Sequence, residues 1–153
     1  MNIKLIEDKS LKRKISKKIL ERLPQWFGIP ESTKEYIEES SSMPFWAVYD
    51  EDNYIGFIAV KITSKYTAEI YVIGVEVEYH RKGIGTALFK ECYNWCKING
   101  YEFLQVKTLD ESNPDIYYKK TRKFYKSLGF RELECFSILW DESNPCLIMI
   151  MKI

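Results

Sequence analysis

Apolar residues recur along the chain with two spacings, one typical of helices and one typical of strands. Between Ser10 and Leu23 they return every three to four positions, with lysines and arginines between them, which predicts an amphipathic helix. Ser10 is its expected N-cap, and Pro24 is expected to end it. A second, shorter helix is predicted over Glu31–Ser42, after the break at Gly28-Ile29-Pro30.

The remainder of the chain alternates between strand and helix patterns. Runs rich in valine, isoleucine and tyrosine predict six strands, and two amphipathic segments that end near glycine predict two further helices. The strands are expected over residues 44–50, 54–62, 67–77, 101–109, 131–140 and 146–153, and the helices over 84–99 and 117–128. This order predicts a mixed α/β fold in which helices pack on a largely antiparallel sheet.

Length and composition fit a single globular domain over residues 1–153, because a chain of this length can bury a full core. Hydrophobic residues make up 46% of the chain and charged residues 29%, which is ordinary for a globular protein. The formal net charge of +1 gives no long-range attraction to nucleic acid or to a membrane surface. We therefore expect neither as a partner.

The four cysteines and the single histidine do not form a metal-binding pattern. Cys92 and Cys96 lie four residues apart on a predicted helix, no Cys-x-x-Cys occurs, and His80 is not near them. We expect no metal and reduced, mostly buried thiols. The first ten residues contain no apolar signal-peptide core, and no apolar run is long enough to span a membrane, so a cytoplasmic protein is expected.

The segment YHRKGIGTAL, Tyr79–Leu88, has the features of an anion-binding turn. A strand ends there, basic residues and two glycines follow, and a helix begins whose first N–H groups lack partners within the helix. A dinucleotide-binding turn would have a third glycine where Leu88 stands, and an ATP-type phosphate loop would have Gly-Lys-Ser/Thr, so both motifs are absent. A plain strand–helix connection, with glycines for tight packing, stays open on these residues alone.

This segment and a second one, TRKFYKSLGF at Thr121–Phe130, together resemble the GCN5-related N-acetyltransferase (GNAT) superfamily. The resemblance covers about residues 43–153 and agrees with two leading helices. It implies a sheet of six to seven strands, about four flanking helices and a splayed pair of central strands. It also implies an enzyme that uses acetyl-coenzyme A as cosubstrate and an amine as acceptor.

In that family the turn has the pattern Gln/Arg-x-x-Gly-x-Gly/Ala and binds the coenzyme pyrophosphate. Gly83 and Gly85 match the two glycines, while His80 stands at the Gln/Arg position. Backbone groups of the residues matching Val75 and Val77 pair with the pantetheine arm, and the Val75 amide faces the thioester carbonyl. The resemblance thus implies the following coenzyme-binding residues: Val75, Val77, His80, Arg81, Lys82, Gly83, Ile84, Gly85, Thr86 and, from a loop further on, Asn113.

Two residues are candidates for proton transfer. Tyr125 stands where the family has a tyrosine near the coenzyme sulfur, and a phenol with an ordinary pKa of about 10 can donate a proton at neutral pH. Glu69, which strand alternation places on one face with Tyr71, Ile73 and Val75, is the candidate base, and a chain of water molecules is the alternative. Glu76 is expected to face solvent or to cap the next helix.

One position of the second segment departs from the family pattern. Tyr118 stands seven residues before Tyr125, where the family often has an asparagine that orders the coenzyme, and Asn113 is the candidate replacement. Basic residues on the same predicted helix are candidates to meet the 3′-phosphate of the coenzyme: Lys119, Arg122, Lys123 and Lys126.

The acceptor side is expected to be aromatic and acidic, which suits a cationic amine. We therefore favour direct acetyl transfer, within a ternary complex, to a small-molecule primary amine. Transfer to a protein N-terminus or lysine is an alternative, and so is a non-catalytic acyl-CoA-binding sensor or partner module. The resemblance also admits a homodimer through the C-terminal strands. The acceptor-side residues are Trp26, Phe27, Tyr36, Phe45 and Trp46, with Glu31, Glu35, Glu38 and Glu39.

Overall fold

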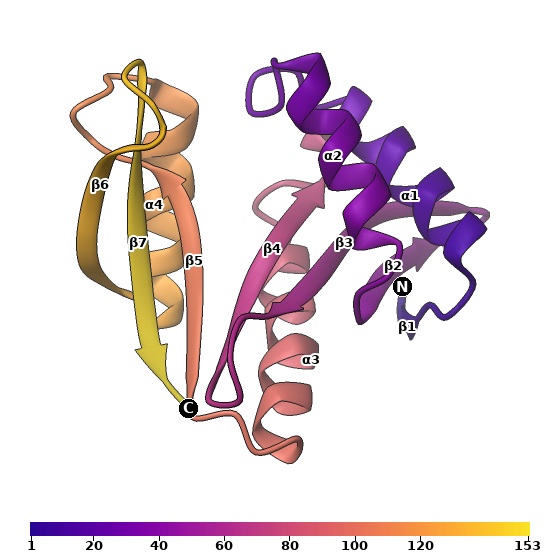
Figure 1. The fold of residues 1–153 in the computed structure, drawn as a ribbon. Coiled ribbons are helices and arrows are strands. Elements are labelled where there is room, and N and C mark those ends of the chain that lie inside the picture. The colour runs from indigo at the N-terminus through magenta and orange to yellow at the C-terminus, as the bar shows by residue number, and fades with distance from the viewer.

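A computed structural model describes residues 1–153 as one seven-stranded mixed sheet flanked by helices (Figure 1). The strands are β1 (Asn2–Leu5), β2 (Phe45–Asp50), β3 (Asn53–Ile62), β4 (Thr67–Val75), β5 (Phe103–Leu109), β6 (Arg131–Asp141) and β7 (Asn144–Lys152). The helices are α1 (Lys9–Glu21), α2 (Pro30–Ser40), α3 (Ile84–Ile98) and α4 (Ile116–Leu128), with a short 3-10 turn over Val77–Tyr79. The strand order is β1-β2-β3-β4-β5-β7-β6, and only the pair β4–β5 is parallel.

The predicted order of elements is confirmed, with one strand added and one cap corrected. Strand β1, which sequence analysis missed, pairs antiparallel with β2 at the sheet edge. It is only four residues long and mostly exposed, so the alternation of Ile3 and Leu5 with polar residues is too short to predict a strand. The expected N-cap Ser10 lies inside α1, and Asp8 caps the helix by accepting the Leu11 N–H at 2.9 Å.

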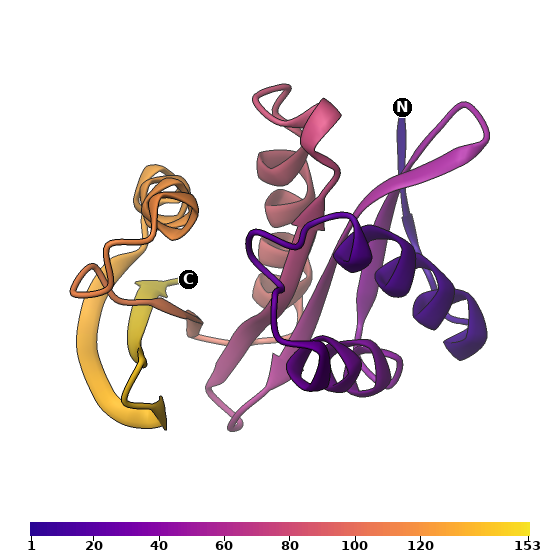
Figure 2. The same cartoon turned by 90° about the horizontal axis from the view of Figure 1, so that it is seen from above.

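Helices cover both faces of the sheet, with α1 and α2 on one face and α3 and α4 on the other (Figure 2). On one face α1 packs against β3 through a cluster that includes Ile19, Leu20 and Phe57. On the other face α3 and α4 contribute Leu88 and Tyr125 to a larger cluster. No helix is both long and apolar enough to cross a lipid bilayer.

The central strands β4 and β5 separate part-way along their length (Figure 1). They pair from Thr67 to Ile70 and from Phe103 to Val106, and no pairing continues beyond Ile70 and Val106. We call this point the fork. The expected splayed strand pair is therefore confirmed, and it leaves one edge of the second half of β4 without a neighbouring strand.

A β-bulge in β4 changes which side chains share a face. The pairing of β3 with β4 steps from Val72 to Ile70 and skips Tyr71. As a result Tyr71 packs on the α1 side, while Ile73 and Val75 pack on the α3 side. The prediction that Glu69 and Val75 share one face is wrong, because alternation holds only within an unbroken ladder.

Candidate active site

The glycine-containing turn after β4 ends in a helix start that has no side-chain cap. Helix α3 begins at Ile84 with Gly83 as its N-cap, and the first bond of the helix runs from the Ala87 N–H to the Gly83 carbonyl at 3.0 Å. The N–H groups of Ile84, Gly85 and Thr86 therefore have no partner within the helix. Such a helix end, with its partial positive charge, favours a bound phosphate group.

The two glycines of the turn have different structural roles. Gly83 has φ +77°, a left-handed conformation, and a Cβ added there would meet no atom within 4 Å. Gly85 has no such φ, and its Cβ would lie 3.0 Å from the Phe124 ring of α4. Gly83 thus shapes the open helix end, whereas Gly85 lets α3 and α4 approach each other.

The free edge of β4 presents main-chain groups beyond the fork. The Glu76 N–H donates to the Ile55 carbonyl at 2.9 Å, so Glu76 faces β3. Alternation in an antiparallel ladder then turns the N–H and C=O groups of Ile73 and Val75 away from β3, toward the side of β5. An extended ligand chain could pair with this edge as a strand does.

The structure does not bring Val77 to the same edge. Strand β4 ends at Val75, and Val77 begins the 3-10 turn, where its carbonyl accepts the His80 N–H at 3.0 Å. Glu76 also differs from expectation. It is 6% exposed and forms ion pairs with Arg22 at 3.1 Å and Lys18 at 3.5 Å, so the prediction that it faces solvent or caps α3 is wrong.

The three basic residues of the turn, His80, Arg81 and Lys82, precede α3 and differ in their contacts. His80 Nε2 lies 2.6 Å from the Val75 carbonyl, which can only accept, so this nitrogen carries the proton. Arg81 is exposed with φ +62°, and exposed Lys82 holds its Nζ 5.2 Å from the Tyr79 ring centre. Arg81 and Lys82 are free to meet an anion, whereas His80 supports the strand end.

Tyr125 lies buried on α4 with its ring among aromatic neighbours. It is 6% exposed, and its ring centre lies 5.6 Å from those of both Phe124 and Phe130. Its hydroxyl makes no hydrogen bond within the protein. Burial raises the pKa of Tyr125, and the nearby Tyr118 and other groups raise it further. The side chain is therefore a neutral phenol.

Glu69 is held at the fork by two residues of β5. It is 3% exposed, its Oε1 accepts the Gln105 amide at 2.7 Å, and the Lys107 Nζ lies 3.4 Å from the same oxygen. Its Oε2 has no partner in the protein. Burial raises the pKa of Tyr36, and the negative charge of Glu69 raises it further.

Tyr36 and Glu39 of α2, together with Tyr71 of β4, form an aromatic and acidic surface that we call the wall. The Tyr36 ring centre lies 5.2 Å from that of Tyr71 and 5.7 Å from that of Phe27. The Tyr71 hydroxyl donates to the Glu39 carboxylate at 2.7 Å. Phe45 and Trp46, which were also expected on the acceptor side, are 0% and 5% exposed and belong to the core, so that part of the prediction is wrong.

A contact that sequence analysis missed ties the α1–α2 connection to α4. The Tyr118 hydroxyl donates to the Trp26 carbonyl at 2.6 Å, and the Trp26 indole N–H donates to Thr121 Oγ1 at 3.1 Å. The Trp26 ring also meets the His80 ring edge-on, with centroids 5.6 Å apart. The only sequence sign of this contact was that Tyr118 departs from the family pattern.

Other predicted residues are engaged elsewhere. Asn113 donates from Nδ2 to the Ser143 carbonyl at 3.1 Å and accepts the Asp115 N–H, which ties it to the β6–β7 turn and not to the α3 start. Arg122 is 7% exposed and donates to the Leu109 carbonyl at 2.7 Å, so it does not meet a phosphate. The basic residues of α4 that stay exposed are Lys119, Lys120, Lys123 and Lys126.

Removing the Tyr118 hydroxyl is expected to weaken the contact between α4 and the α1–α2 connection, because its hydrogen bond to the Trp26 carbonyl is lost. Tyr118→Phe should lower the free energy of unfolding by about 1 kcal/mol, the usual value of one such hydrogen bond. The melting temperature should then fall by roughly 2–4 °C for a chain of this size. Tyr117→Phe is the matched control, because the Tyr117 hydroxyl makes no hydrogen bond within the protein. Equal melting temperatures for the two variants would contradict the assignment.

Comparison with known proteins places this geometry in a family. The family model described as acetyltransferase (GNAT) domain matches residues 41–132, which is more than half of the chain. The chain belongs to the GNAT acetyltransferase family. Enzymes of this family use acetyl-CoA as the acetyl donor, and the uncapped start of α3 beside the free edge of β4 fits the pyrophosphate and arm of that molecule. The structure contains no cluster of three or more metal-ligating side chains.

Known relatives share parts of the sequence and the whole fold. Streptothricin acetyltransferase A from Bacillus subtilis (strain 168) is 36% identical over 75 residues, which cover 49% of this chain and 43% of that protein. The match thus spans less than half of the relative's length. Aminoglycoside 6′-N-acetyltransferase complexed with coenzyme A has a TM-score of 0.76 at 20% identity, covering 99% of this chain and 97% of its own. Ribosomal-protein-S18-alanine N-acetyltransferase from Escherichia coli has a TM-score of 0.75 at 18% identity, covering 99% and 93%.

Proposed function

We propose that this GNAT protein transfers the acetyl group of acetyl-CoA to a small-molecule primary amine by direct attack in a ternary complex. The observation that carries the proposal is the buried Tyr125 phenol on α4, whose hydroxyl has no hydrogen-bond partner within the protein. A protein that only bound acyl-CoA, as a sensor or partner module, would have no use for a free proton donor there.

The start of α3 would hold the coenzyme. The N–H groups of Ile84, Gly85 and Thr86 face an anion without competing partners, and the exposed side chains of Arg81 and Lys82 add positive charge. The main-chain groups of Ile73 and the N–H of Val75 beyond the fork would pair with the extended arm, whereas the Val75 carbonyl is already bonded to His80. These contacts align the thioester with the acceptor, which is the main requirement of this reaction.

The proton transfers would use the two residues at the fork. The amine must be neutral to attack, and the free Oε2 of Glu69 is the place for its proton, directly or through water. The departing thiolate needs a proton, and the neutral Tyr125 hydroxyl would donate it. The two residues thus act on opposite ends of the same transfer, the base on the nucleophile and the acid on the leaving group.

The wall formed by Tyr36, Tyr71 and Glu39 supports a cationic acceptor, because aromatic faces and carboxylates both attract ammonium groups. The streptothricin and aminoglycoside acetyltransferases named above act, by their names, on small molecules. The ribosomal-protein-S18-alanine enzyme acts on a protein, and its TM-score is almost the same, so the fold does not separate the two acceptor classes. The charged aromatic wall is what favours the small cation.

Calorimetric titration with acetyl-CoA, dephospho-CoA and desulfo-CoA tests the coenzyme site first. We expect a micromolar dissociation constant for acetyl-CoA, and a panel of cationic amines should then release free thiol from it. Release with peptide N-termini but with none of the small amines would favour protein acetylation instead. Absence of acetyl-CoA binding at millimolar concentration would end both versions of the proposal.

A further inference from the structure

Thr108 of β5 carries the one fully enclosed side-chain oxygen or nitrogen atom that has no hydrogen-bond partner in the protein. The residue is 2% exposed, and its Oγ1 meets neither a donor nor an acceptor. A buried hydroxyl without a partner destabilises the folded state, whereas an apolar side chain of the same shape at that place would not. Valine has nearly the shape of threonine, so stability alone does not account for the hydroxyl.

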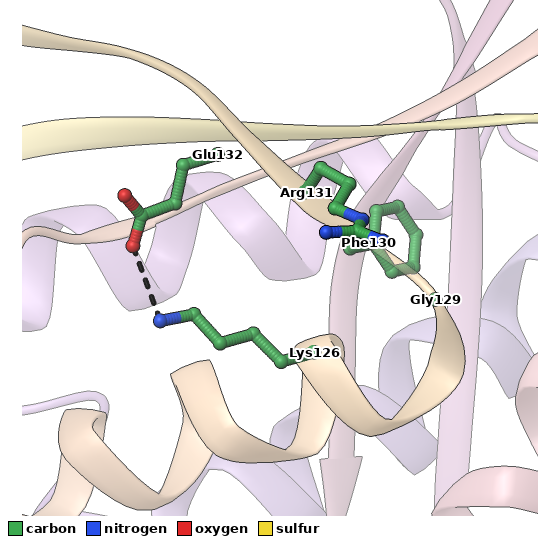
Figure 3. A pocket seen from close by; sticks show the side chains of 5 residues that line it. All are labelled: Lys126, Gly129, Phe130, Arg131 and Glu132. Atoms are coloured by element: carbon green, nitrogen blue, oxygen red, sulfur yellow. Dashed lines mark ion pairs between the residues drawn. The ribbon is translucent and has the colours of Figure 1, made fainter.

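Other enclosed or clustered polar groups of the protein do find partners. Thr33, the other buried threonine, has its hydroxyl 3.3 and 3.2 Å from two main-chain carbonyl oxygens. In the charged hollow at the start of β6, which Figure 3 shows, Lys126 Nζ lies 3.2 Å from Glu132 Oε1. The unpartnered hydroxyl of Thr108 is therefore an exception within this chain, and such exceptions in buried places are typical of ligand sites.

Thr108 lies on β5 just beyond the fork. The last pair that joins the two central strands is Ile70 opposite Val106, so Thr108 is two residues past it. On β4 the free main-chain groups begin at Ile73, three residues past the same pair, and the bulge at Tyr71 accounts for the extra residue. Thr108 and Ile73 therefore stand at about the same level on the two strands that separate.

The side chain of Thr108 points to the side of the sheet that α4 covers. Val106, two residues earlier, and Leu147, directly opposite Thr108 on β7, both belong to the core cluster on that side. Arg122 of α4 donates at 2.7 Å to the carbonyl of the next residue of β5, which holds α4 against this end of the strand. Tyr125 follows one helical turn later on the same face of α4. Two hydroxyl groups without partners in the protein, one on β5 and one on α4, thus belong to the same side of the sheet.

We propose that the Thr108 hydroxyl forms a hydrogen bond with the arm of acetyl-CoA at its thioester end. The arm lies between β4 and β5, with the main chain of Ile73 on one side and Thr108 on the other. It enters from the side on which β5 has no neighbouring strand, because β7 occupies the other edge. Amide and thioester groups offer both donors and acceptors, and a hydroxyl can pair with either. This inference rests on the function proposed above, since acetyl-CoA is the ligand.

Thr108→Val tests the proposal, because it should weaken binding without weakening the fold. Calorimetric titration should show an affinity for acetyl-CoA that is lower by about 3- to 10-fold, the usual effect of one lost hydrogen bond. The melting temperature of the variant without ligand should stay the same or rise, since the removed hydroxyl has no partner in the protein. Thr108→Ser keeps the hydroxyl and should keep most of the affinity. The affinity for 3′,5′-ADP, which lacks the arm, should be equal in Thr108→Val and the unaltered protein.

Thr33→Val is the matched control, because its hydroxyl is bonded within the protein. Its melting temperature should fall, and its affinity for acetyl-CoA should not change. If Thr108→Val gives this same result, or binds acetyl-CoA as tightly as the unaltered protein, the inference is wrong and the proposed function stands. Weaker binding of 3′,5′-ADP to Thr108→Val would also overturn it, since the change would then act on the nucleotide end. If the unaltered protein does not bind acetyl-CoA at millimolar concentration, the proposed function and this inference fail together.

Discussion

Replacing Tyr125 with phenylalanine is expected to lower the rate of acetyl transfer by about 10²–10⁴-fold, the usual contribution of a positioned acid. Only the hydroxyl is lost, and that hydroxyl makes no hydrogen bond within the protein, so the ring packing against Phe124 and Phe130 persists. The affinity for acetyl-CoA should therefore change little. Thiol release measured at saturating acetyl-CoA, beside a calorimetric titration of the same variant, separates catalysis from binding.

The pH dependence of the unaltered enzyme gives a second test of the same role. Burial raises the pKa of Tyr125 above its ordinary value of about 10, so the phenol keeps its proton as the pH rises through the range used for assays. The rate should rise as the amine loses its proton and then reach a plateau, without an alkaline fall due to Tyr125. A fall that begins well below pH 10 in the unaltered enzyme and is missing in Tyr125→Phe would contradict the raised pKa.

Tyr93→Phe is the matched control for this substitution. Tyr93 is a half-buried helix tyrosine, packed against Phe89 on α3, and the proposed chemistry does not use it. Its loss should leave both the rate and the coenzyme affinity near their original values. If Tyr125→Phe keeps the same transfer rate and coenzyme affinity as Tyr93→Phe, then Tyr125 is not the proton donor. The donor would then be another group or water, and a non-catalytic acyl-CoA-binding protein would become the better interpretation.

Local patterns in the sequence were sufficient to predict the order of elements and the place of the anion-binding turn. The helices and most strands carry regular hydrophobic spacing, and Gly129 ends α4 at φ +111° as a glycine cap does. The turn at Gly83 was identifiable because strand, glycine and helix follow one another along the chain. In each case the residues that define the feature are neighbours in sequence.

Features that depend on distant residues could not be predicted in this way. The bulge at Tyr71 arises from the register between β3 and β4, and it moves Ile73 to the face opposite to the expected one. Glu76 is buried and forms ion pairs with Lys18 of α1 and with Arg22, the residue that follows α1. Both corrections follow from tertiary contacts, which strand alternation and local charge patterns do not encode.

In the candidate site, too, features set by neighbouring residues could be predicted and features set by distant residues could not. Tyr125 could be singled out from its motif, but its unpartnered hydroxyl could not, because that depends on what surrounds it after folding. The tie between Trp26 and Tyr118 joins residues 92 positions apart. The distinct roles of Gly83 and Gly85 likewise became visible only when the contact of Gly85 with Phe124 was known.

The second large effect is expected at Gly83, where a valine should weaken acetyl-CoA binding by about 10- to 100-fold. A β-branched residue avoids φ +77°, at a cost of roughly 1–2 kcal/mol, and the turn would shift to relieve that strain. The shift would re-aim the N–H groups at the start of α3, each worth about 1.5–3 kcal/mol when bonded to a charged group. Calorimetric titration of the variant with acetyl-CoA measures the loss.

Gly100 supplies the matched control at the other end of the same helix. It has φ +83°, and like Gly83 it has no atom within 4 Å of an added Cβ. Gly100→Val should therefore cost similar stability without affecting the coenzyme, whereas Gly83→Asn, which tolerates the left-handed conformation, should keep most of the affinity. If all three variants bind acetyl-CoA equally well, the start of α3 does not hold the pyrophosphate. If Gly83→Asn fails as badly as Gly83→Val, the open space beside Gly83 matters more than its backbone conformation.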